Sequence, residues 1–189
     1  MYIIVDVDDK NLTDEEIVEQ VLQDNIELFG LIIERYEKKL LRYGKKFLSD
    51  SDDIKDLVQE VFIKTYTNIA SFDTNKKFSP WIYRIAHNCF INEIKRKSRV
   101  CIVPIDTDTI FPQLFSLYDP EKEVLDNELK ENLDLCLNKI DIKYKEIIIL
   151  FYIENLSYKE ISDILHISVN LVGIRLNRGK KAMRKILRY

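Results

Sequence analysis

The amino-acid sequence predicts an all-α protein of two small helical domains, the second of which is a helix-turn-helix. Apolar residues recur at helical spacing through most of the chain. Two Ser/Thr-x-x-Glu capping boxes, at Thr13 and Ser157, mark helix starts in both halves. Residues 99–119 interrupt the helical pattern, and 189 residues suffice for two small domains. We therefore predict domains over residues 1–98 and 120–189, joined by a linker over 99–119.

Four helices are predicted in the first domain. Thr13 caps the first, and residues 17–22 carry its apolar face. Apolar positions in residues 26–47 and 54–69 predict the second and third helices, and the segment 71–77 then breaks the pattern. A fourth helix is expected over residues 78–97, because Pro80 fits a first helical turn, where its missing N–H removes no hydrogen bond.

The middle of the chain has a different composition. Residues 99–119 contain Pro104, Pro112 and several Asp and Thr residues without a sustained period, which is typical of an interdomain linker. Helices are expected over residues 121–138 and 143–154. The centre of the second is rich in β-branched residues, which also suit a strand. Its helical neighbours and the lack of strand partners favour a helix, and residues 2–5 are expected to be irregular for want of a partner.

The last third of the chain predicts a helix-turn-helix. After the capping box at Ser157, a buried stripe is expected at Ile161, Ile164 and Leu165, followed by a tight turn at residues 166–167. Ser168 is a good N-cap for a second helix over residues 168–187. In such a unit the second helix enters the major groove of DNA. Three of its residues are expected to face the core: Leu171, Val172 and Leu176.

The charge distribution indicates two surfaces with different partners. The formal net charge is only −3, but the segment 1–60 holds twice as many acidic as basic side chains. The segment 172–189, by contrast, is rich in Lys and Arg and has no acid. On the second helix of the predicted motif, Asn170, Arg175 and Arg178 could reach bases or phosphates. Lys180 and Lys181 are better placed for the DNA backbone, which contributes affinity without sequence information.

Composition excludes several classes of protein. The chain is 46% hydrophobic and 32% charged, with only four Gly and four Pro, which is unlike disordered or fibrous proteins. It has no apolar run long enough to cross a membrane, and its first residues lack the basic start of a secretory signal. Three distant cysteines and two histidines argue against a disulfide framework or a metal site. We expect a cytoplasmic protein without metal or cofactor.

Five motifs occur in one order along the two predicted domains: DLVQEVF at 56–62, FSPWIYRIAHN at 78–88, KRKSR at 95–99, LSYKEIS at 156–162 and RLNRG at 175–179. Together, these motifs resemble those of bacterial RNA polymerase sigma factors of the extracytoplasmic-function (ECF) group. The resemblance covers roughly residues 12–98 and 121–188. At the start of the recognition helix the family often has GTVKSR, whereas this chain has NLVGIR over residues 170–175.

The resemblance implies a role for each part of the chain. Asp56, Gln59 and Glu60 would dock on the clamp of the largest subunit of core RNA polymerase, and the flap of the polymerase is a further contact. The loop 71–77 and the helix 78–99 would read and open the −10 promoter element, and the helix-turn-helix would read the −35 element. The linker would run toward the active-site and RNA-exit channel. An anti-sigma factor is an expected regulatory partner.

Residue chemistry around the predicted fourth helix agrees with DNA opening, because aromatic and cationic groups hold unstacked bases. Trp81 is favoured as a core residue by periodicity, while Asn88 suits a base edge and a local hydrogen bond equally well. Arg84, Arg96 and Arg99 are expected on phosphates. The candidates for contact with the −10 element are Phe72, Lys76, Lys77, Trp81, Tyr83, Arg84, Asn88, Arg96 and Arg99. The candidates for contact with the −35 element are Ser168, Asn170, Arg175, Arg178, Lys180 and Lys181.

Two other functions compete with that of a promoter-specificity subunit. An autonomous helix-turn-helix regulator with an N-terminal sensing or dimerising domain would bind operator DNA tightly without polymerase. An enzyme is disfavoured, because His87 and His166 lie in different predicted domains without a nucleophile and carboxylate beside them. The sequence also has no Gly-rich phosphate loop and no metal-ligand spacing.

Overall fold

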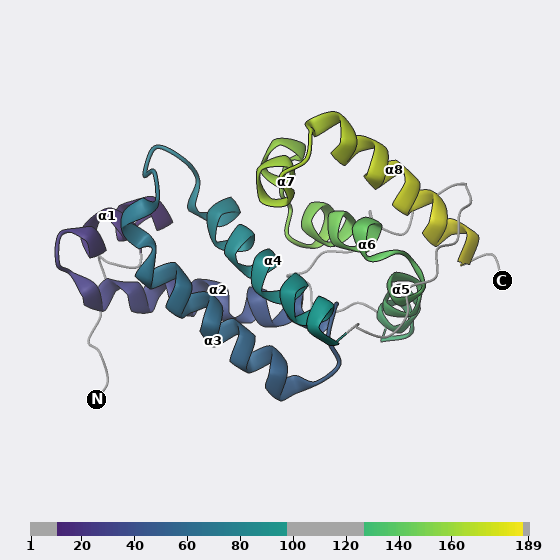
Figure 1. Ribbon diagram of the computed structural model, residues 1–189, viewed down its shortest axis with the longest axis horizontal. Coiled ribbons are helices and arrows are strands. Elements are labelled where there is room, and N and C mark those ends of the chain that lie inside the picture. Colours follow the sequence, from purple (N-terminus) through teal and green to yellow (C-terminus); the bar gives the residue numbers. More distant parts are fainter. Residues whose placement is uncertain (1–10, 98–126, 187–189) are drawn as a thin grey trace. The chain divides into compact units, whose positions relative to one another are not determined.

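The computed structural model describes residues 11–97 and 127–186, and all regular structure in these ranges is helical (Figure 1). The helices form two compact units, which are described separately. The N-terminal unit comprises residues 11–97, and the C-terminal unit comprises residues 127–186. The prediction of an all-α chain with two helical domains is therefore confirmed. The predicted linker over 99–119 and the expectation for residues 2–5 lie outside the described residues.

The N-terminal unit contains four α-helices and two short 3-10 turns. Thr13 caps the first helix with both bonds of a capping box, as its sequence predicts. Asp50 caps the third by accepting from the backbone N–H groups of Asp52 and Asp53, so this helix begins before the predicted position. The elements are α1 (Asp14–Leu22), η2 (Ile26–Leu28), α2 (Phe29–Lys45), α3 (Ser51–Thr67), η3 (Ile69–Ser71) and α4 (Phe78–Lys97).

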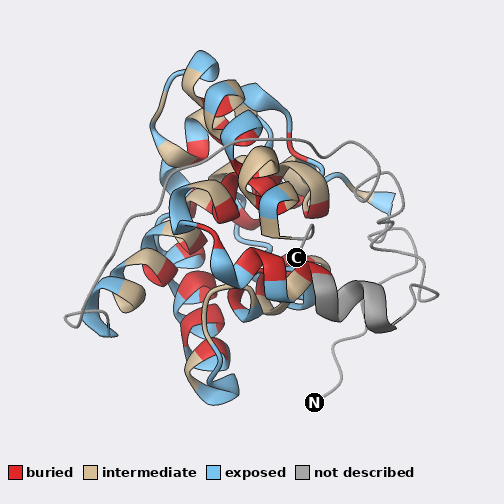
Figure 2. Ribbon diagram, turned by 90° about the vertical axis from the view of Figure 1, so that its right-hand side faces the viewer, coloured by how far each residue is buried: buried red, intermediate tan, exposed pale blue. Residues whose placement is uncertain are grey.

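The core of the N-terminal unit is aromatic where α2 meets α4. Tyr36 contacts Phe78 with ring centroids 5.6 Å apart, and Tyr43 contacts Tyr83 and Phe90, each at 5.7 Å. All three pairs meet edge to face, an arrangement that contributes about 0.5–1.5 kcal/mol per pair beyond burial. Buried and exposed residues alternate along the helices in Figure 2, as amphipathic packing requires.

The C-terminal unit contains four α-helices and one π-helical segment. Asp141 caps the second of these helices by accepting from the backbone N–H of Lys143 at 3.0 Å. The helix predicted over 143–154 is present, but its second half is π-helical, with the N–H of Glu154 bonded to the carbonyl of Ile149. The elements are α5 (Asn127–Lys139), α6 (Ile142–Ile148), η5 (Ile149–Ile153), α7 (Tyr158–Leu165) and α8 (Val169–Ile186).

The C-terminal unit packs around α8, the second helix of the helix-turn-helix, which contacts α5, α6 and α7. Val172 and Leu176 are buried there as predicted. Leu165 and Leu171 are only half-buried, because each lies at the edge of its helix's buried stripe. The two helices of the motif are therefore held by a narrower apolar seam than the sequence pattern suggests.

Gly44 allows α2 to pass close to its neighbours. An added Cβ would lie 2.6 Å from one atom of the Phe90 ring and 2.8 Å from a methyl of Ile54. Both side chains are almost completely buried, so neither can move aside freely. By contrast, a Cβ at Gly30 of the same helix would meet no atom within 4 Å.

We expect Gly44→Ala to destabilise the protein and Gly30→Ala to stabilise it. Overpacking of a core costs about 1–3 kcal/mol, whereas Ala in a helix is favoured over Gly by about 1 kcal/mol. Chemical denaturation followed by circular dichroism measures both free energies of unfolding. Equal stability of the two variants would show that the crossing at Gly44 is looser than the structure indicates.

Candidate nucleic-acid interface

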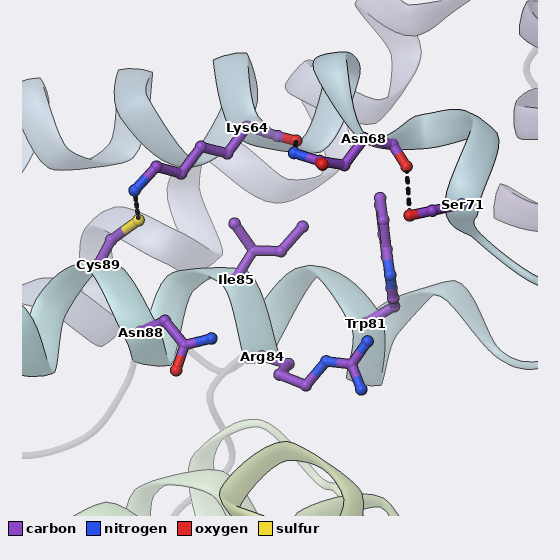
Figure 3. A pocket seen from close by; sticks show the side chains of 8 residues that line it. All are labelled: Lys64, Asn68, Ser71, Trp81, Arg84, Ile85, Asn88 and Cys89. Carbon is purple, nitrogen blue, oxygen red and sulfur yellow. Dashed lines mark hydrogen bonds between the residues drawn. The ribbon is translucent and has the colours of Figure 1, made fainter.

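A pocket opens on the N-terminal unit between the end of α3 and the first half of α4 (Figure 3). The α4 residues at 81, 84, 85 and 88 share one helix face, because their spacing is three or four. The pocket combines an aromatic ring, two cationic side chains and two amides, the groups that hold an unstacked base and its phosphate. Its lining residues are Lys64, Asn68, Ser71, Trp81, Arg84, Ile85, Asn88 and Cys89.

Lys64 supplies the charge on the α3 side of this pocket. Its Nζ lies 2.6 Å from Oε1 of Glu60 and donates a hydrogen bond to Sγ of Cys89 at 3.6 Å (Figure 3). The hydrogen bond to Glu60 raises the pKa of Lys64, so the amine stays charged. Burial raises the pKa of Cys89, so its thiol stays protonated at neutral pH.

Asn68 and Ser71 form the turn that closes the pocket at the end of α3. The Asn68 amide donates to the backbone carbonyl of Lys64 at 2.7 Å, and the Ser71 hydroxyl donates to the carbonyl of Asn68 at 2.7 Å (Figure 3). The same two carbonyls also accept from the backbone N–H groups of Asn68 and Ser71, so backbone and side-chain bonds reinforce each other at this turn. The turn therefore fixes the pocket wall with local hydrogen bonds.

Trp81 links the pocket to the core. Its ring centroid lies 5.2 Å from that of Phe72 and 5.6 Å from that of Phe78. The side chain is half-buried and lines the pocket, so the expectation of a core residue is correct only in part. The Trp81 side chain thus packs against the core and also forms part of the pocket wall.

Two predicted contacts of the −10 element, Phe72 and Tyr83, are corrected by the structure. Phe72 is 7% exposed and packs between Phe78 and Trp81. Tyr83 is 2% exposed and faces α2, because it shares the helix stripe of Phe90. Neither ring is available to stack on a base, and we assign both to the core.

The remaining predicted cations of this unit differ in their surroundings. Lys76 and Lys77 are exposed in the loop before α4, and Lys76 lies 3.3 Å from Asp73. Arg96 makes a two-point ion pair with Glu93 of the same helix, with N–O distances of 2.7 and 2.6 Å. Arg99 lies outside the described residues. Lys76, Lys77 and Arg96 are thus all exposed, and Lys76 and Arg96 each lie beside an acid three residues away.

The predicted polymerase-binding residues lie together on the outer face of α3. Asp56, Gln59 and Glu60 are all exposed, whereas Leu57 and Val61 of the same helix are buried. This alternation follows from helical spacing, which places residues 56, 59 and 60 on one side. The face is polar and acidic, and through Glu60 it adjoins the Lys64 wall of the pocket.

The turn of the helix-turn-helix is built from local hydrogen bonds. His166 adopts a left-handed conformation with φ of 51°, which reverses the chain after α7. The Ser162 hydroxyl donates to the carbonyl of Ile167 at 2.5 Å. Ser168 then caps α8 by accepting from the backbone N–H of Leu171 at 3.2 Å. The Ser168 side chain thus serves the fold, in addition to its predicted place at the −35 element.

The exposed side of α8 carries the other predicted contacts of the −35 element. Asn170 and Arg178 are exposed, whereas Arg175, Lys180 and Lys181 are half-buried. Arg175 acts electrostatically on Asp141 at the start of α6. Burial raises the pKa of Asp141, but its hydrogen bonds from Lys143, with the charges of Lys143 and Arg175, lower the pKa below its ordinary value.

Sequence reasoning missed two polar pocket residues, Lys64 and Asn68, and it included Ser71 only as the start of the loop 71–77. A signal was present, because Lys64 lies four residues after Glu60 and continues the polar face of α3. Following that face to the end of the helix leads to Asn68 and then to Ser71. The close approach of α4 to this end of α3, however, is a tertiary feature.

The described ranges also bear on metal and membrane sites. Within residues 11–97 and 127–186, no group of three or more His, Cys, Asp or Glu side chains is arranged to hold a metal ion. In the same ranges, no helix has the length and apolarity needed to span a bilayer.

Two protein-family profiles match the chain, one in each unit. Sigma-70 region 2 matches residues 32–100, and Sigma-70, region 4 matches residues 130–183. The fold resembles that of CnrH, solved in complex with the cytosolic domain of CnrY, with a TM-score of 0.70, 22% identity and coverage of 93% of this chain and 97% of that one. It also resembles the sigma factor RpoE of Bartonella quintana, solved with the anti-sigma factor NepR, with a TM-score of 0.65, 21% identity and coverage of 85% and 96%.

Curated relatives match nearly the whole chain. The ECF RNA polymerase sigma factor SigW of Bacillus subtilis is 35% identical over 179 residues, which cover 90% of this chain and 95% of the relative. The ECF RNA polymerase sigma-E factor of Haemophilus influenzae is 31% identical over 178 residues, with coverage of 91% and 94%. The chain therefore belongs to the ECF group of RNA polymerase sigma factors, alternative sigma factors that direct promoter recognition and the initiation of transcription.

Proposed function

We propose that the N-terminal unit opens the −10 element and the C-terminal unit reads the −35 element while the chain is bound to core RNA polymerase. The observation that carries this proposal is the pocket at α4, which combines Trp81, Arg84 and Asn88 with Lys64 of α3. The polymerase supplies the chemistry of RNA synthesis, and this chain supplies promoter choice. This function places the chain in the cytoplasm with the polymerase.

Strand opening requires a surface that replaces the stacking and pairing a base loses when it leaves the duplex. In the pocket, Trp81 offers an aromatic ring, and the Asn88 amide can both donate and accept hydrogen bonds. Lys64 and Arg84 provide positive charge for the neighbouring phosphates. Lys76 and Lys77, in the exposed loop before α4, extend this charge.

We propose that core polymerase docks on the acidic face of α3, formed by Asp56, Gln59 and Glu60. This face is exposed and lies away from the core. The partner surface is the clamp of the largest subunit, and the flap of the polymerase receives the C-terminal unit. We also propose that the predicted linker over 99–119 leads toward the active-site and RNA-exit channel of the polymerase.

For the −35 element, we propose that α8 enters the major groove with its first half. Asn170, Arg175 and Arg178 then face base edges or phosphates, with Ser168 at the helix N-terminus close to the backbone. Lys180 and Lys181 lie further along the helix and contact phosphates. No residue of α8 is acidic, so the positive electrostatic field of the helix attracts DNA along its whole length.

We also propose that an anti-sigma factor regulates the chain by covering its polymerase-binding surface. The family resemblance suggests such a partner, and the similar structure from Bartonella quintana contains a sigma factor together with an anti-sigma factor. The exposed acidic face of α3 is the surface that such a protein would have to occupy to prevent docking.

Run-off transcription with purified core polymerase tests the proposed function. Promoters are first identified by mapping transcription starts after overexpression. We expect the chain to stimulate transcription from these promoters only together with core polymerase, and to bind their DNA weakly alone. Tight, specific binding of the isolated chain to duplex DNA, without stimulation of core polymerase, would favour an autonomous regulator instead.

Charge reversal at Asp56 and Glu60 tests the docking face. We expect Asp56→Lys and Glu60→Lys each to weaken core binding at least about tenfold, or about 1.4 kcal/mol, because they place positive charge in an acidic interface. The fold should survive, since both residues are exposed. Binding is measured by fluorescence anisotropy, with Glu19→Lys, at an exposed position of α1, as the matched control. Unchanged core affinity would place the interface elsewhere.

Truncation of Arg175 and Arg178 tests groove binding by α8. An arginine that contacts a guanine contributes about 1–3 kcal/mol, and one that contacts a phosphate changes the salt dependence of binding. We expect Arg175→Ala and Arg178→Ala to reduce transcription from a promoter that requires its −35 element. Lys159→Ala, at an exposed position of α7, serves as the control. Full activity of both arginine variants would refute this placement of the helix.

A further inference from the structure

The first turn of α4 is capped by a residue from a distant helix. The N–H groups at the start of a helix lack partners within it, and they are usually satisfied by a side chain just before the helix. Here the backbone N–H of Phe78 donates to Oε1 of Glu15 at 2.7 Å, across 63 residues of sequence. Glu15 lies in the first turn of α1. Its carboxylate also interacts favourably with the positive end of the α4 dipole.

Glu15 is held in place by its neighbour Asp14. One oxygen of Asp14 accepts from Nη1 of Arg35 at 2.7 Å, and the other accepts from the hydroxyl of Tyr36 at 2.6 Å. Nη2 of Arg35 donates in turn to the carbonyl of Leu12 at 2.7 Å. The first turn of α1 is therefore fastened to α2, so the Glu15 carboxylate stands on a rigid support.

The same support reaches α4 through Tyr36. Its ring meets that of Phe78 edge to face, and its hydroxyl interacts with the side chain of Ser79. Burial raises the pKa of Tyr36, and the hydrogen bond to Asp14 raises it further, so the hydroxyl remains a neutral donor. The first two residues of α4 are thus held by two adjacent carboxylates of α1, Glu15 directly and Asp14 through Tyr36.

The position of Phe78 determines that of Trp81. Both rings pack together with Phe72, at centroid distances of 5.2–5.6 Å. Trp81 is the residue through which this aromatic cluster reaches the pocket. A shift of the first turn of α4 would therefore move the Trp81 ring relative to Lys64 and Arg84, which lie on either side of the pocket (Figure 3).

We propose that Glu15 is a positioning residue for strand opening, because it caps α4 and thereby sets the place of Trp81 in the pocket. This inference rests on the proposed role of the pocket at the −10 element. Glu15 itself does not line the pocket. It acts through the backbone of Phe78, so its loss should affect DNA opening and leave the docking face on α3 unchanged.

Four full-length variants separate the roles of charge, reach and fold. Glu15→Ala removes the acceptor, and Glu15→Asp keeps the charge but shortens the side chain by one methylene. Glu15→Gln keeps the length and one carbonyl acceptor without the charge. Glu19→Ala removes an exposed acid from the same helix and is the matched control.

The first measurement uses Trp81, the only tryptophan of the chain, as a local probe. We expect acrylamide quenching of its fluorescence to rise about twofold in Glu15→Ala and Glu15→Asp, because the Trp81 ring is then no longer held in one position against Phe78. Glu15→Gln and Glu19→Ala should resemble the wild type. All spectra are taken well below each variant's midpoint of thermal unfolding, so general destabilisation does not contribute.

The second measurement follows promoter opening by the holoenzyme. The promoter that supports run-off transcription carries 2-aminopurine in its −10 element, and core affinity is measured in parallel. We expect opening to slow about tenfold in Glu15→Ala and Glu15→Asp, with core affinity within twofold of the wild type, and to be largely retained in Glu15→Gln.

Unchanged quenching and opening in Glu15→Ala and Glu15→Asp would overturn the proposal and leave Glu15 a purely structural residue. If Glu15→Gln showed the same rise in quenching and the same slowing of opening, the proposal would also be overturned. The charge of Glu15, and not its hydrogen bond to the N–H of Phe78, would then be what matters. A loss of affinity for core polymerase in the Glu15 variants would overturn the claim that Glu15 acts on DNA opening without affecting the docking face on α3. Failure of the wild type to open any promoter would instead refute the proposed function, while the Trp81 quenching would still test the cap.

Discussion

Aromatic packing between α2 and α4 is the interaction on which the rest of the N-terminal unit depends. Tyr36 and Tyr43 of α2 each hold at least one aromatic residue of α4, and Gly44 lets the ring of Phe90 approach the α2 backbone. Because aromatic edges and a missing Cβ define this distance, α4 has little freedom to slide. Its other face is thereby held at the end of α3, where the pocket forms.

The pocket joins two kinds of physical interaction. Its aromatic side continues the core through Trp81, so it is set by packing. Its charged side depends on the ion pair between Glu60 and Lys64. An exposed pair of this type contributes only about 0.3–0.5 kcal/mol to stability. The main effect of this ion pair is to position the Lys64 amine at the pocket, and its contribution to the stability of the fold is small.

Much of the fold could be predicted from local sequence signals. The capping boxes at Thr13 and Ser157 and the ends of α4 are where the sequence places them, because caps and helical periodicity act within a few residues. The π-helical segment Ile149–Ile153 was not predicted. Apolar spacing alone does not distinguish a π-turn from an α-turn, since both bury the same run of residues.

The candidate site was harder to predict than the fold, because it depends on which helix faces which. Composition favours Tyr83 as a DNA contact, but only the position of α2 shows that its ring is buried. Lys64 carries no distinctive local signal and becomes part of the pocket through the approach of α4. Glu15 likewise meets Phe78 only in three dimensions.

The two carboxylates near the end of α4 affect how strongly DNA binding depends on ionic strength. Glu93 holds Arg96, and Asp53 forms an ion pair with Lys97. A cation that is already paired exchanges one anion for another when it meets a phosphate, so it displaces fewer condensed counterions from DNA. The N-terminal unit should therefore lose less affinity with added salt than a tally of its basic residues implies.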